Sequence, residues 1–495
     1  MTPDAGEHPA EIRTADGDPT TAGPDHHERL HPLRAGLAPQ LTAGALTTDP
    51  DVVASHARDE APFADVGTAL GLVRARTVQD VQATMRYASE HRIPVVPQGA
   101  RSGISGGANA VDGCLLLSVE RMDRILQIDA AEQTVTVEPG IINQDLKDAV
   151  AAHGLSYPPD PGSVALSSIG GNLATNAGGL CCVKYGVTRD YVRQVAVVLA
   201  DGTLTRLGST TAKGVAGLDL CGLFVGSEGT LGIIVEATLR LVPSLPPPLT
   251  AVATFPHARA AAQTVAEFMG GGARPSMMES LDRISIDLLN RFGDFGLDGQ
   301  AGALLLMQSD GGGVAAEAAR EVAAFAAVAE RLGALDVAFS EDPEDSDALV
   351  AARRLAQPAF ERYSRDHGGG QLLDDVCLPR TAIPEFYDRL DAIRARTGLM
   401  IAVVAHAGDG NVHPSVFFDA ADEASVRRAH EAFDEIMAIG LELGGTITGE
   451  HGVGSLKSAW LARELDEGSR RLHRSVKDAV DPLGILNPGK QFAAL

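Results

Sequence analysis

Cysteine is scarce in this sequence. Five cysteines occur in 495 residues, and no two of them form a Cys-x-x-Cys pair. An odd number without such pairs argues against a disulfide framework and against an iron-sulfur cluster. Cys181 and Cys182 are adjacent, but neighbouring residues rarely reach disulfide geometry, so we expect small buried side chains there.

Long apolar runs and basic clusters are also missing. No uninterrupted apolar stretch of about 18 residues is present, and no apolar run follows basic residues at the N-terminus, which disfavours a membrane span and a signal peptide. Asp and Glu number 65 against 41 Lys and Arg, which gives a net charge of -24. This charge repels polyanions, so nucleic acid is not an expected partner. The sequence therefore predicts a soluble cytoplasmic protein.

The most informative feature that is present lies near the C-terminus. The segments 406–413 (HAGDGNVH) and 449–452 (GEHG) place three histidines, two carboxylates and an asparagine among glycines. Imidazole nitrogens and carboxylate oxygens are the ligands that a Zn²⁺-like ion prefers, and an imidazole left free of the metal could move a proton. A single histidine is more often structural, but the two segments together favour metal-assisted acid–base chemistry. Residues 401–405 predict a buried strand that leads into this cluster.

The N-terminal part of the chain changes character near residue 40. Residues 1–40 are rich in Pro, Gly, Thr and charged residues and contain few large apolar ones, a composition typical of a disordered tail. From Val66 the pattern predicts a strand at 71–75, a helix at 77–90 capped by Thr77, and a strand at 93–96. The first folded part therefore begins with a strand–helix–strand unit.

Prolines mark the boundary between two folded parts. Pro243 and the run 246–248 interrupt the chain after a predicted strand. We therefore predict a first domain over 41–245 and a second domain over 246–455. The remaining segment, 456–495, is predicted to fold back on the first domain.

Three glycine-rich segments follow one another in the first domain. The loop 97–107 fits neither the GxGxxG pattern nor the Walker pattern, which would need Lys-Ser or Lys-Thr at its end, and by itself it could be a flexible surface loop. Segments 160–179 and 224–234 also combine glycines with Ser and Asn. Glycines let backbone N–H groups approach a pyrophosphate, and Ser and Asn add hydrogen bonds without burying charge. The three segments together favour a dinucleotide cofactor.

In this order the three segments resemble the FAD-binding domain of the vanillyl-alcohol oxidase and p-cresol methylhydroxylase flavoproteins. The motifs 157–162 (YPPDPG), 449–454 (GEHGVG) and 481–490, with the histidine segment, narrow the resemblance to one branch. That branch contains the FAD-linked subunit of glycolate oxidase, D-lactate dehydrogenases and D-2-hydroxyglutarate dehydrogenase. The resemblance implies an α+β protein, in which a two-lobed FAD-binding domain of the p-cresol methylhydroxylase type is joined to an α+β substrate and metal cap domain of the FAD-linked oxidase C-terminal type.

The resemblance also implies which residues form the site. Those expected to contact FAD are Pro97, Gly99, Ala100, Arg101, Ser102, Gly103, Ser105, Gly106, Pro161, Gly162, Ser163, Ser168, Gly170, Gly171, Asn172, Asn176, Gly178, Gly179, Glu228, Gly229, Gly232, Ile233, Ile234 and Asn487. A divalent metal, with zinc as the first candidate, would be bound by His406, His413 and Glu450. His451 would handle the proton, and Arg353 would hold the substrate carboxylate, which its planar fork suits.

The mode of FAD attachment also follows from the resemblance. Members of the superfamily that attach flavin covalently often use a histidine in or near the first glycine-rich loop. The loop 97–107 contains no histidine. We therefore expect FAD to be dissociable.

Two positions depart from the pattern of the D-2-hydroxyglutarate enzymes. Those enzymes carry a Lys just before an Asp-hydrophobic-Ser-Leu-Pro stretch, where it helps to hold the distal carboxylate, and the matching stretch here, 372–379, has none. An Asn follows their second metal-binding histidine by two residues, whereas Ser415 stands here. Asp374 and Asp375 would add negative charge beside the place of the missing lysine, unless they point to solvent. Both departures favour a monocarboxylate substrate.

The hypothesis from the sequence is an FAD-dependent dehydrogenase that oxidises a small D-2-hydroxy acid, D-lactate first and glycolate second. A quinone, a cytochrome, an electron-transferring flavoprotein or an iron-sulfur subunit would serve as electron acceptor, and any contact with a membrane would be made through it. A homodimer is compatible with the sequence. The alternatives are a D-2-hydroxyglutarate or D-malate dehydrogenase of the same branch, a non-catalytic FAD subunit of a larger oxidoreductase, and a metal hydrolase without flavin.

Overall fold

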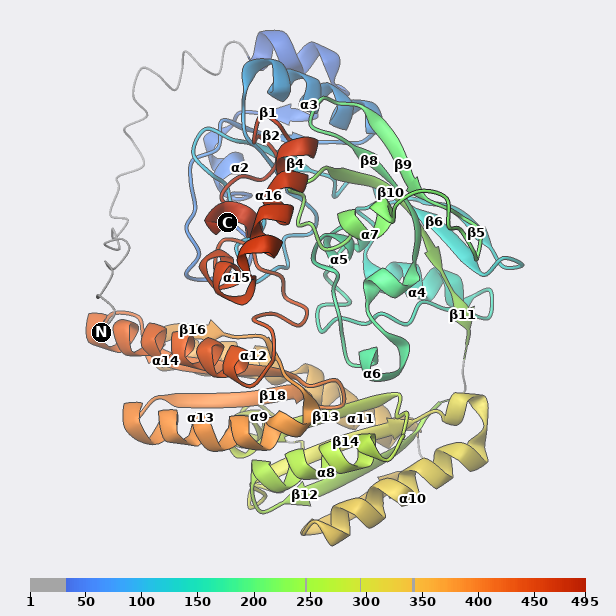
Figure 1. Ribbon diagram of the computed structural model, residues 1–495, viewed down its shortest axis with the longest axis vertical. Helices are drawn as coiled ribbons and strands as arrows, with labels where there is room; N and C mark the ends of the chain where they lie inside the picture. Colours follow the sequence, from blue (N-terminus) through green and yellow to red (C-terminus); the bar gives the residue numbers. More distant parts are fainter. Residues whose placement is uncertain (1–32, 245–246, 294, 341–342) are drawn as a thin grey trace.

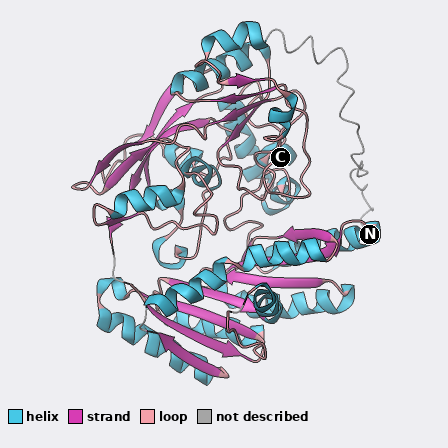
Figure 2. Ribbon diagram, turned by 180° about the vertical axis from the view of Figure 1, so that it is seen from behind, coloured by secondary structure: helices cyan, strands magenta, loops and turns pink. Residues whose placement is uncertain are grey.

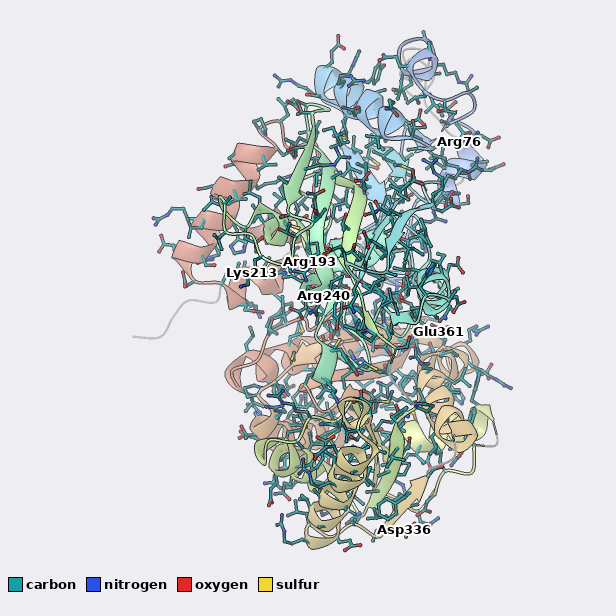
Figure 3. The ribbon with its side chains drawn as sticks, turned by 90° about the vertical axis from the view of Figure 1, so that its right-hand side faces the viewer. Arg76, Arg193, Lys213, Arg240, Asp336 and Glu361 are labelled. Carbon is teal, nitrogen blue, oxygen red and sulfur yellow. The ribbon has the colours of Figure 1, made fainter. Side chains whose placement is uncertain are left out.

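Two domains make up the described part of the chain, which covers residues 33–244, 247–293, 295–340 and 343–495 of a computed structural model. In Figure 1 the first domain, coloured blue to green, lies above the second, coloured yellow-green to orange, and the red C-terminal segment returns to the first. Seen from the side in Figure 3, Arg76 marks the far end of the first domain and Asp336 the far end of the second.

One lobe of the first domain is built on a sheet with the strand order β1-β2-β4-β3. Strands β2, β4 and β3 are parallel, and helix α3 lies between β2 and β3 in the chain. Thr77 and Asp80 form a capping box at the start of α3, which confirms the predicted cap. The elements of this lobe are η1 (Leu33–Leu37), η2 (Ala38–Gln40), β1 (Leu46–Thr47), α2 (Pro50–Ala54), β2 (Gly71–Arg74), α3 (Val78–His91), β3 (Val95–Gln98) and β4 (Leu115–Ser118).

The predicted disordered tail is too long at its C-terminal end. Residues 33–40 form the helical turns η1 and η2, and Leu33 and Leu37 are buried in the same core cluster as Val81 and Met85 of α3. Two leucines four residues apart lie on one face of a helical turn, and this short apolar face is enough to pack on α3. Residues 1–32 lie outside the described part of the chain.

The other lobe contains an antiparallel sheet with the order β5-β6-β10-β8-β9. Residues between its strands form short helices, one of which lies in the second glycine-rich segment, and the third glycine-rich segment leads into strand β10. The elements are β5 (Ile125–Asp129), β6 (Thr134–Val137), α4 (Asn143–Ala151), β7 (Leu155–Ser156), α5 (Ile169–Thr175), α6 (Cys182–Tyr185), η3 (Thr188–Tyr191), β8 (Val192–Val198), β9 (Leu204–Gly208), α7 (Leu220–Phe224), β10 (Ile233–Arg240) and β11 (Val242–Pro243).

The second domain is one antiparallel sheet with the order β15-β12-β14-β13-β18-β19-β16, and β17 pairs with β19. Helices α8, α10, α13 and α14 supply one apolar core, and α9 and α12 supply another. Figure 2 shows the strands in magenta with helices packed around them. The elements are β12 (Leu249–Phe255), α8 (Ala258–Gly270), β13 (Met277–Asp282), α9 (Arg283–Phe292), β14 (Ala303–Ser309), η4 (Gly311–Gly313), α10 (Ala315–Arg331), β15 (Asp336–Ser340), α11 (Pro343–Arg354), α12 (Ala356–Asp366), β16 (Gly369–Leu373), β17 (Val376–Cys377), η5 (Arg380–Ala382), α13 (Ile383–Thr397), β18 (Met400–His406), β19 (Asn411–Asp419) and α14 (Glu423–Glu442).

The C-terminal segment contacts both domains. It contains α15 (Ser458–Glu464), α16 (Glu467–Val480) and η6 (Gln491–Ala494). Trp460 packs into the core of the second domain, and the residues after α15 return to the first. Leu486 forms a parallel bridge with Val95, and the Asn487 side chain donates to the carbonyl oxygens of Gly107 (3.0 Å) and Glu228 (2.7 Å). Among the described helices, none combines the length and the apolar character that crossing a membrane requires.

Candidate active site

The three predicted metal ligands lie together. His406 ends β18 and His413 lies on the paired strand β19, so the sheet holds both rings side by side. Glu450 approaches from the loop after α14, with its Oε1 3.0 Å from His406 Nε2 and 3.4 Å from His413 Nε2. One donor atom from each residue falls within 4.8 Å of the others. The strand predicted at 401–405 is confirmed as part of β18, and its end places the first histidine.

A buried glutamate orients His406. Glu279 on the neighbouring strand β13 is fully buried and lies 2.8 Å from His406 Nδ1. Because a carboxylate accepts on that side, the ring turns Nε2 toward Glu450, as in metal sites where a carboxylate fixes the histidine. The sequence analysis missed Glu279. The signal was an acidic residue, Glu279, in the short run 277–281 that contains three large apolar residues.

Arg353 joins the same network. Its Nη2 lies 2.8 Å from Glu279 Oε2, and its Nε is buried without a hydrogen-bond partner. The predicted substrate arginine is therefore beside the histidine cluster, anchored by one nitrogen and with another unused. The next residue, Arg354, lies 3.0 Å from Asp160 of the first domain. Helix α11 thus links the cluster to a glycine-rich segment.

Asp375 holds the loop that carries Glu450 and His451. Its Oδ2 accepts from Thr448 Oγ1 (2.6 Å) and from the backbone N–H groups of Gly449 (3.0 Å), Glu450 (3.0 Å) and His451 (2.8 Å). Burial would raise the pKa of Asp375, but His451, Lys457 and His413 hold it below its usual value. Asp374 is ion-paired with Lys457 at 3.0 Å, and both aspartates are fully buried. The alternative that these two aspartates point to solvent is therefore wrong.

His451 is the most accessible histidine of the cluster. Its side chain is 20% exposed, against 7% for His406 and 6% for His413. Its ring stacks on His413 with centroids 4.8 Å apart, and its Nδ1 lies 3.9 Å from Asp375 Oδ2. Burial lowers the pKa of His451 to about 4, although Asp375 opposes the shift. The ring is thus neutral near pH 7, with one nitrogen turned toward Asp375.

The cluster fits a divalent cation. Burial would raise the pKa of Glu450, but His406 and His413 hold it well below its usual value, so it carries charge. Four buried polar atoms around it have no hydrogen-bond partner: His413 Nδ1, Asp375 Oδ1, Asp409 Oδ1 and Asn411 Oδ1. Buried acceptors without donors are costly, and a cation among carboxylates and imidazoles compensates them. Nitrogen and oxygen donors suit Zn²⁺ as well as other divalent ions.

The three glycine-rich segments meet in the first domain. Ala100 N donates to Ser168 Oγ at 3.3 Å, and a Cβ on Gly99 would lie 2.4 Å from the same hydroxyl. Gly229 has a φ of +70°, and a Cβ there would lie 2.3 Å from Pro97 Cγ. Glycine suits these two positions, because a Cβ would collide with the Ser168 hydroxyl or with the Pro97 ring.

All the predicted cofactor residues except Asn487, which lies in the C-terminal segment, fall into three groups. Pro97, Gly99, Ala100, Arg101, Ser102, Gly103, Ser105 and Gly106 form the loop after β3; Pro161, Gly162, Ser163, Ser168, Gly170, Gly171, Asn172, Asn176, Gly178 and Gly179 surround α5; and Glu228, Gly229, Gly232, Ile233 and Ile234 lead into β10. The side chains of several predicted cofactor residues, among them Ser168, Asn172 and Asn176, already have protein partners. Glu228 accepts backbone N–H groups, and Asn487 donates to backbone carbonyls.

A cavity of about 590 Å³ opens beside the first loop. Its lining residues are Ala100, Glu120, Asp123, Ile125, Gly140, Ile141, Ile142 and Asp145. This volume is in the range of cofactor sites, and Ala100 ties it to the predicted FAD loop. The other lining residues were missed by the sequence analysis. The Pro139-Gly140 turn after β6 was the signal that could have found them.

Gly178 is where the first domain touches a predicted metal ligand. A Cβ at Gly178 would lie 2.6 Å from Glu450 Oε2. Gly178→Ala is therefore expected to displace Glu450 and weaken metal binding by roughly tenfold or more, with FAD retained. The affinity is measured by Zn²⁺ competition with a chromogenic chelator. Gly270→Ala is the control, because nothing lies within 4 Å of its Cβ position and Gly270 belongs to no predicted site. Equal affinities in both variants would contradict this placement.

Known protein families match both domains. Residues 69–208 match the FAD binding domain, and residues 248–491 match the C-terminal domain of FAD linked oxidases. The glycolate oxidase subunit GlcD of Bacillus subtilis (strain 168) is 40% identical over 422 residues, which cover 85% of this chain and 88% of the relative. The D-lactate dehydrogenase of Archaeoglobus fulgidus is 33% identical over 422 residues, which cover 85% of this chain and 90% of the relative.

Solved structures share the fold. A substrate-bound p-cresol methylhydroxylase superposes with a TM-score of 0.79 at 17% identity, covering 96% of this chain and 98% of that chain. The 4-ethylphenol oxidase from Gulosibacter chungangensis superposes with a TM-score of 0.77 at 20% identity, with the same coverage. The fold class predicted from the sequence is confirmed.

Proposed function

The chain belongs to the FAD-linked oxidases, and we propose that it oxidises a small D-2-hydroxy acid to the 2-oxo acid, with D-lactate as first candidate and glycolate as second. The observation that carries the proposal is the cluster of His406, His413 and Glu450 with His451 beside it, placed where the FAD-binding domain reaches the cap through Gly178. The two curated relatives, a glycolate oxidase subunit and a D-lactate dehydrogenase, support hydroxy-acid oxidation.

Each predicted site residue has its own role in the proposed reaction. A metal held by His406, His413 and Glu450 would lower the pKa of the substrate hydroxyl, and non-covalent FAD would supply the hydride acceptor. Arg353, fixed by Glu279, holds the substrate carboxylate with its unused Nε. His451 turns Nδ1 toward Asp375, so its Nε2 is the atom that takes the hydroxyl proton. The electrons then leave through a separate acceptor.

A monocarboxylate substrate suits the surroundings better than a dicarboxylate. Lys457 forms an ion pair with Asp374 and donates to the carbonyl of Ile447 at 2.8 Å. It is therefore not free to bind a second substrate carboxylate, as the lysine of the dicarboxylate enzymes does. Ser415 is fully buried and accepts from Gln371 Nε2 at 3.3 Å. A second carboxylate would meet no free cation from these residues, and burying it unpaired is costly.

A substrate panel tests the proposal. D-lactate or glycolate should exceed D-2-hydroxyglutarate and D-malate in kcat/KM by roughly tenfold or more, because a pocket without a partner for a charged group rejects it. L-lactate should be poor, since its α-hydrogen faces away from the flavin. The assay uses the FAD-loaded protein with an artificial dye acceptor, and anaerobic bleaching of the flavin bands follows the half-reaction directly.

Each other outcome favours a different function. Preference for a dicarboxylate would move the protein to the D-2-hydroxyglutarate or D-malate enzymes of the branch. Flavin bands that persist with every acid would favour a non-catalytic FAD subunit. A purified protein without flavin bands would contradict the proposal as a whole.

A further inference from the structure

The segment 448–454 carries Glu450 and His451 across the boundary between the two domains. On the cap side its first residues are fixed by Asp375, which accepts three consecutive backbone N–H groups from it. A carboxylate that accepts several backbone donors holds a loop firmly, since these charge-assisted bonds are stronger than neutral ones. Asp375 therefore fixes one end of the segment.

The other end is held by the first domain. Glu228 Oε1 accepts from Val453 N and Glu228 Oε2 accepts from Gly454 N, both at 2.7 Å. Glu228 is itself fixed, because its backbone N donates to Ala174 O at 2.8 Å and its carbonyl accepts from Asn487 at 2.7 Å. Its φ of +50° is left-handed, a conformation that residues other than glycine rarely adopt. This strained backbone conformation places the buried Glu228 carboxylate against the segment.

The segment also rests on the first glycine-rich loop. Ser105 O accepts from Ser455 N at 3.1 Å and from Leu456 N at 3.2 Å. A Cβ on Gly454 would lie 2.0 Å from that oxygen, and Gly454 has a φ of +52°. The loop expected to hold the FAD pyrophosphate and the segment that carries the proton acceptor are therefore in direct backbone contact.

We propose that Glu228 is a positioning residue, which holds Val453 and Gly454 so that Glu450 and His451 keep their places relative to the flavin domain. The inference rests on the proposed metal-binding role of Glu450. It makes the metal affinity of the cap depend on a carboxylate of the other domain, one that touches neither metal nor substrate.

Glu228→Gln tests the proposal because glutamine keeps the shape but turns an NH₂ group toward one of two N–H donors. In the FAD-loaded protein, the Kd for Zn²⁺ should rise roughly tenfold or more, as for lost outer contacts of metal ligands, while the flavin bands remain. The kcat should fall and KM should change little. Glu228→Asp keeps the charge but is shorter, so its affinity for Zn²⁺ should be intermediate. If the glutamine variant loses FAD, the aspartate variant tests whether Glu228 is a positioning residue.

Glu321→Gln is the matched control. Glu321 is also buried, and it accepts from Arg274 N at 2.9 Å and from the Ser309 hydroxyl, but it lies on α10 of the cap. Unchanged Zn²⁺ affinity in both Glu228 variants, with tight binding in the natural protein, would overturn the proposal and leave the proposed function standing. Absence of Zn²⁺ binding in the natural protein would overturn this proposal, while the substrate panel would still test the proposed function separately.

Discussion

Replacing His451 by alanine is expected to lower kcat by roughly 10² to 10⁴-fold, the range for a lost general base. The ring stands beside Glu450 with its Nε2 3.6 Å from Glu450 Oε1, and it is the most exposed imidazole of the cluster. Its loss removes the proton acceptor but none of the three proposed metal ligands. The measurement is kcat at saturating D-2-hydroxy acid with a dye acceptor, together with flavin spectra and bound zinc.

The controls separate proton transfer from folding. His473→Ala removes another histidine, one that lies on α16 and bonds the carbonyl of Ser469 at 2.9 Å, and it should leave kcat unchanged. Flavin and zinc should stay bound in the His451 variant. If that variant kept full kcat, His451 would have no part in the reaction. If it lost zinc, its role would be metal binding, together with Asp375 and His413, whose donor atoms also lie within 4.8 Å of its own.

Local patterns made much of the fold predictable. The cap of α3 depends on Thr77 and Asp80 within one helical turn, and the apolar run 401–405 gave β18 because such a run buries on both faces of a sheet. The glycine-rich loops could also be predicted, since a positive φ and the close approach of the Pro97 ring favour glycine at positions such as Gly229. Each of these features is decided by residues near one another in the chain.

The partners of the site were not predictable in the same way. Glu279 lies 127 positions from His406 in the chain, and only the pairing of β13 with β18 brings them together. Glu228 reaches the segment 448–454 across a domain boundary. The predicted end of the disordered tail at residue 40 was wrong for a related reason. Leu33 and Leu37 are ordered because they pack on α3, and the composition of the tail does not show this contact. Contacts of this kind depend on the tertiary structure, which local patterning does not encode.

Replacing Lys457 by methionine is expected to destabilise the cap domain by about 3 to 5 kcal/mol, the cost of leaving a buried charge without its partner. Lys457 Nζ lies 3.0 Å from Asp374 Oδ1, and both residues are almost completely buried. Burial raises the pKa of Asp374, and Lys457 is the main group that opposes the shift. For a domain of this size the change corresponds to a fall in Tm of roughly 6 to 20 °C, which a thermal melt of the FAD-loaded protein measures.

A double variant shows whether the unpaired charge is the cause. Asp374→Asn combined with Lys457→Met removes both charges, so the melting temperature should recover in part, and the coupling between the two sites gives the energy of the pair. Arg320→Met is the surface control: it breaks an ion pair with Glu317 whose side chains are 70% and 52% exposed, and such pairs contribute at most about 1 kcal/mol. A double variant as unstable as Lys457→Met alone would show that lost packing of the lysine stem, and not the charge of Asp374, controls stability here.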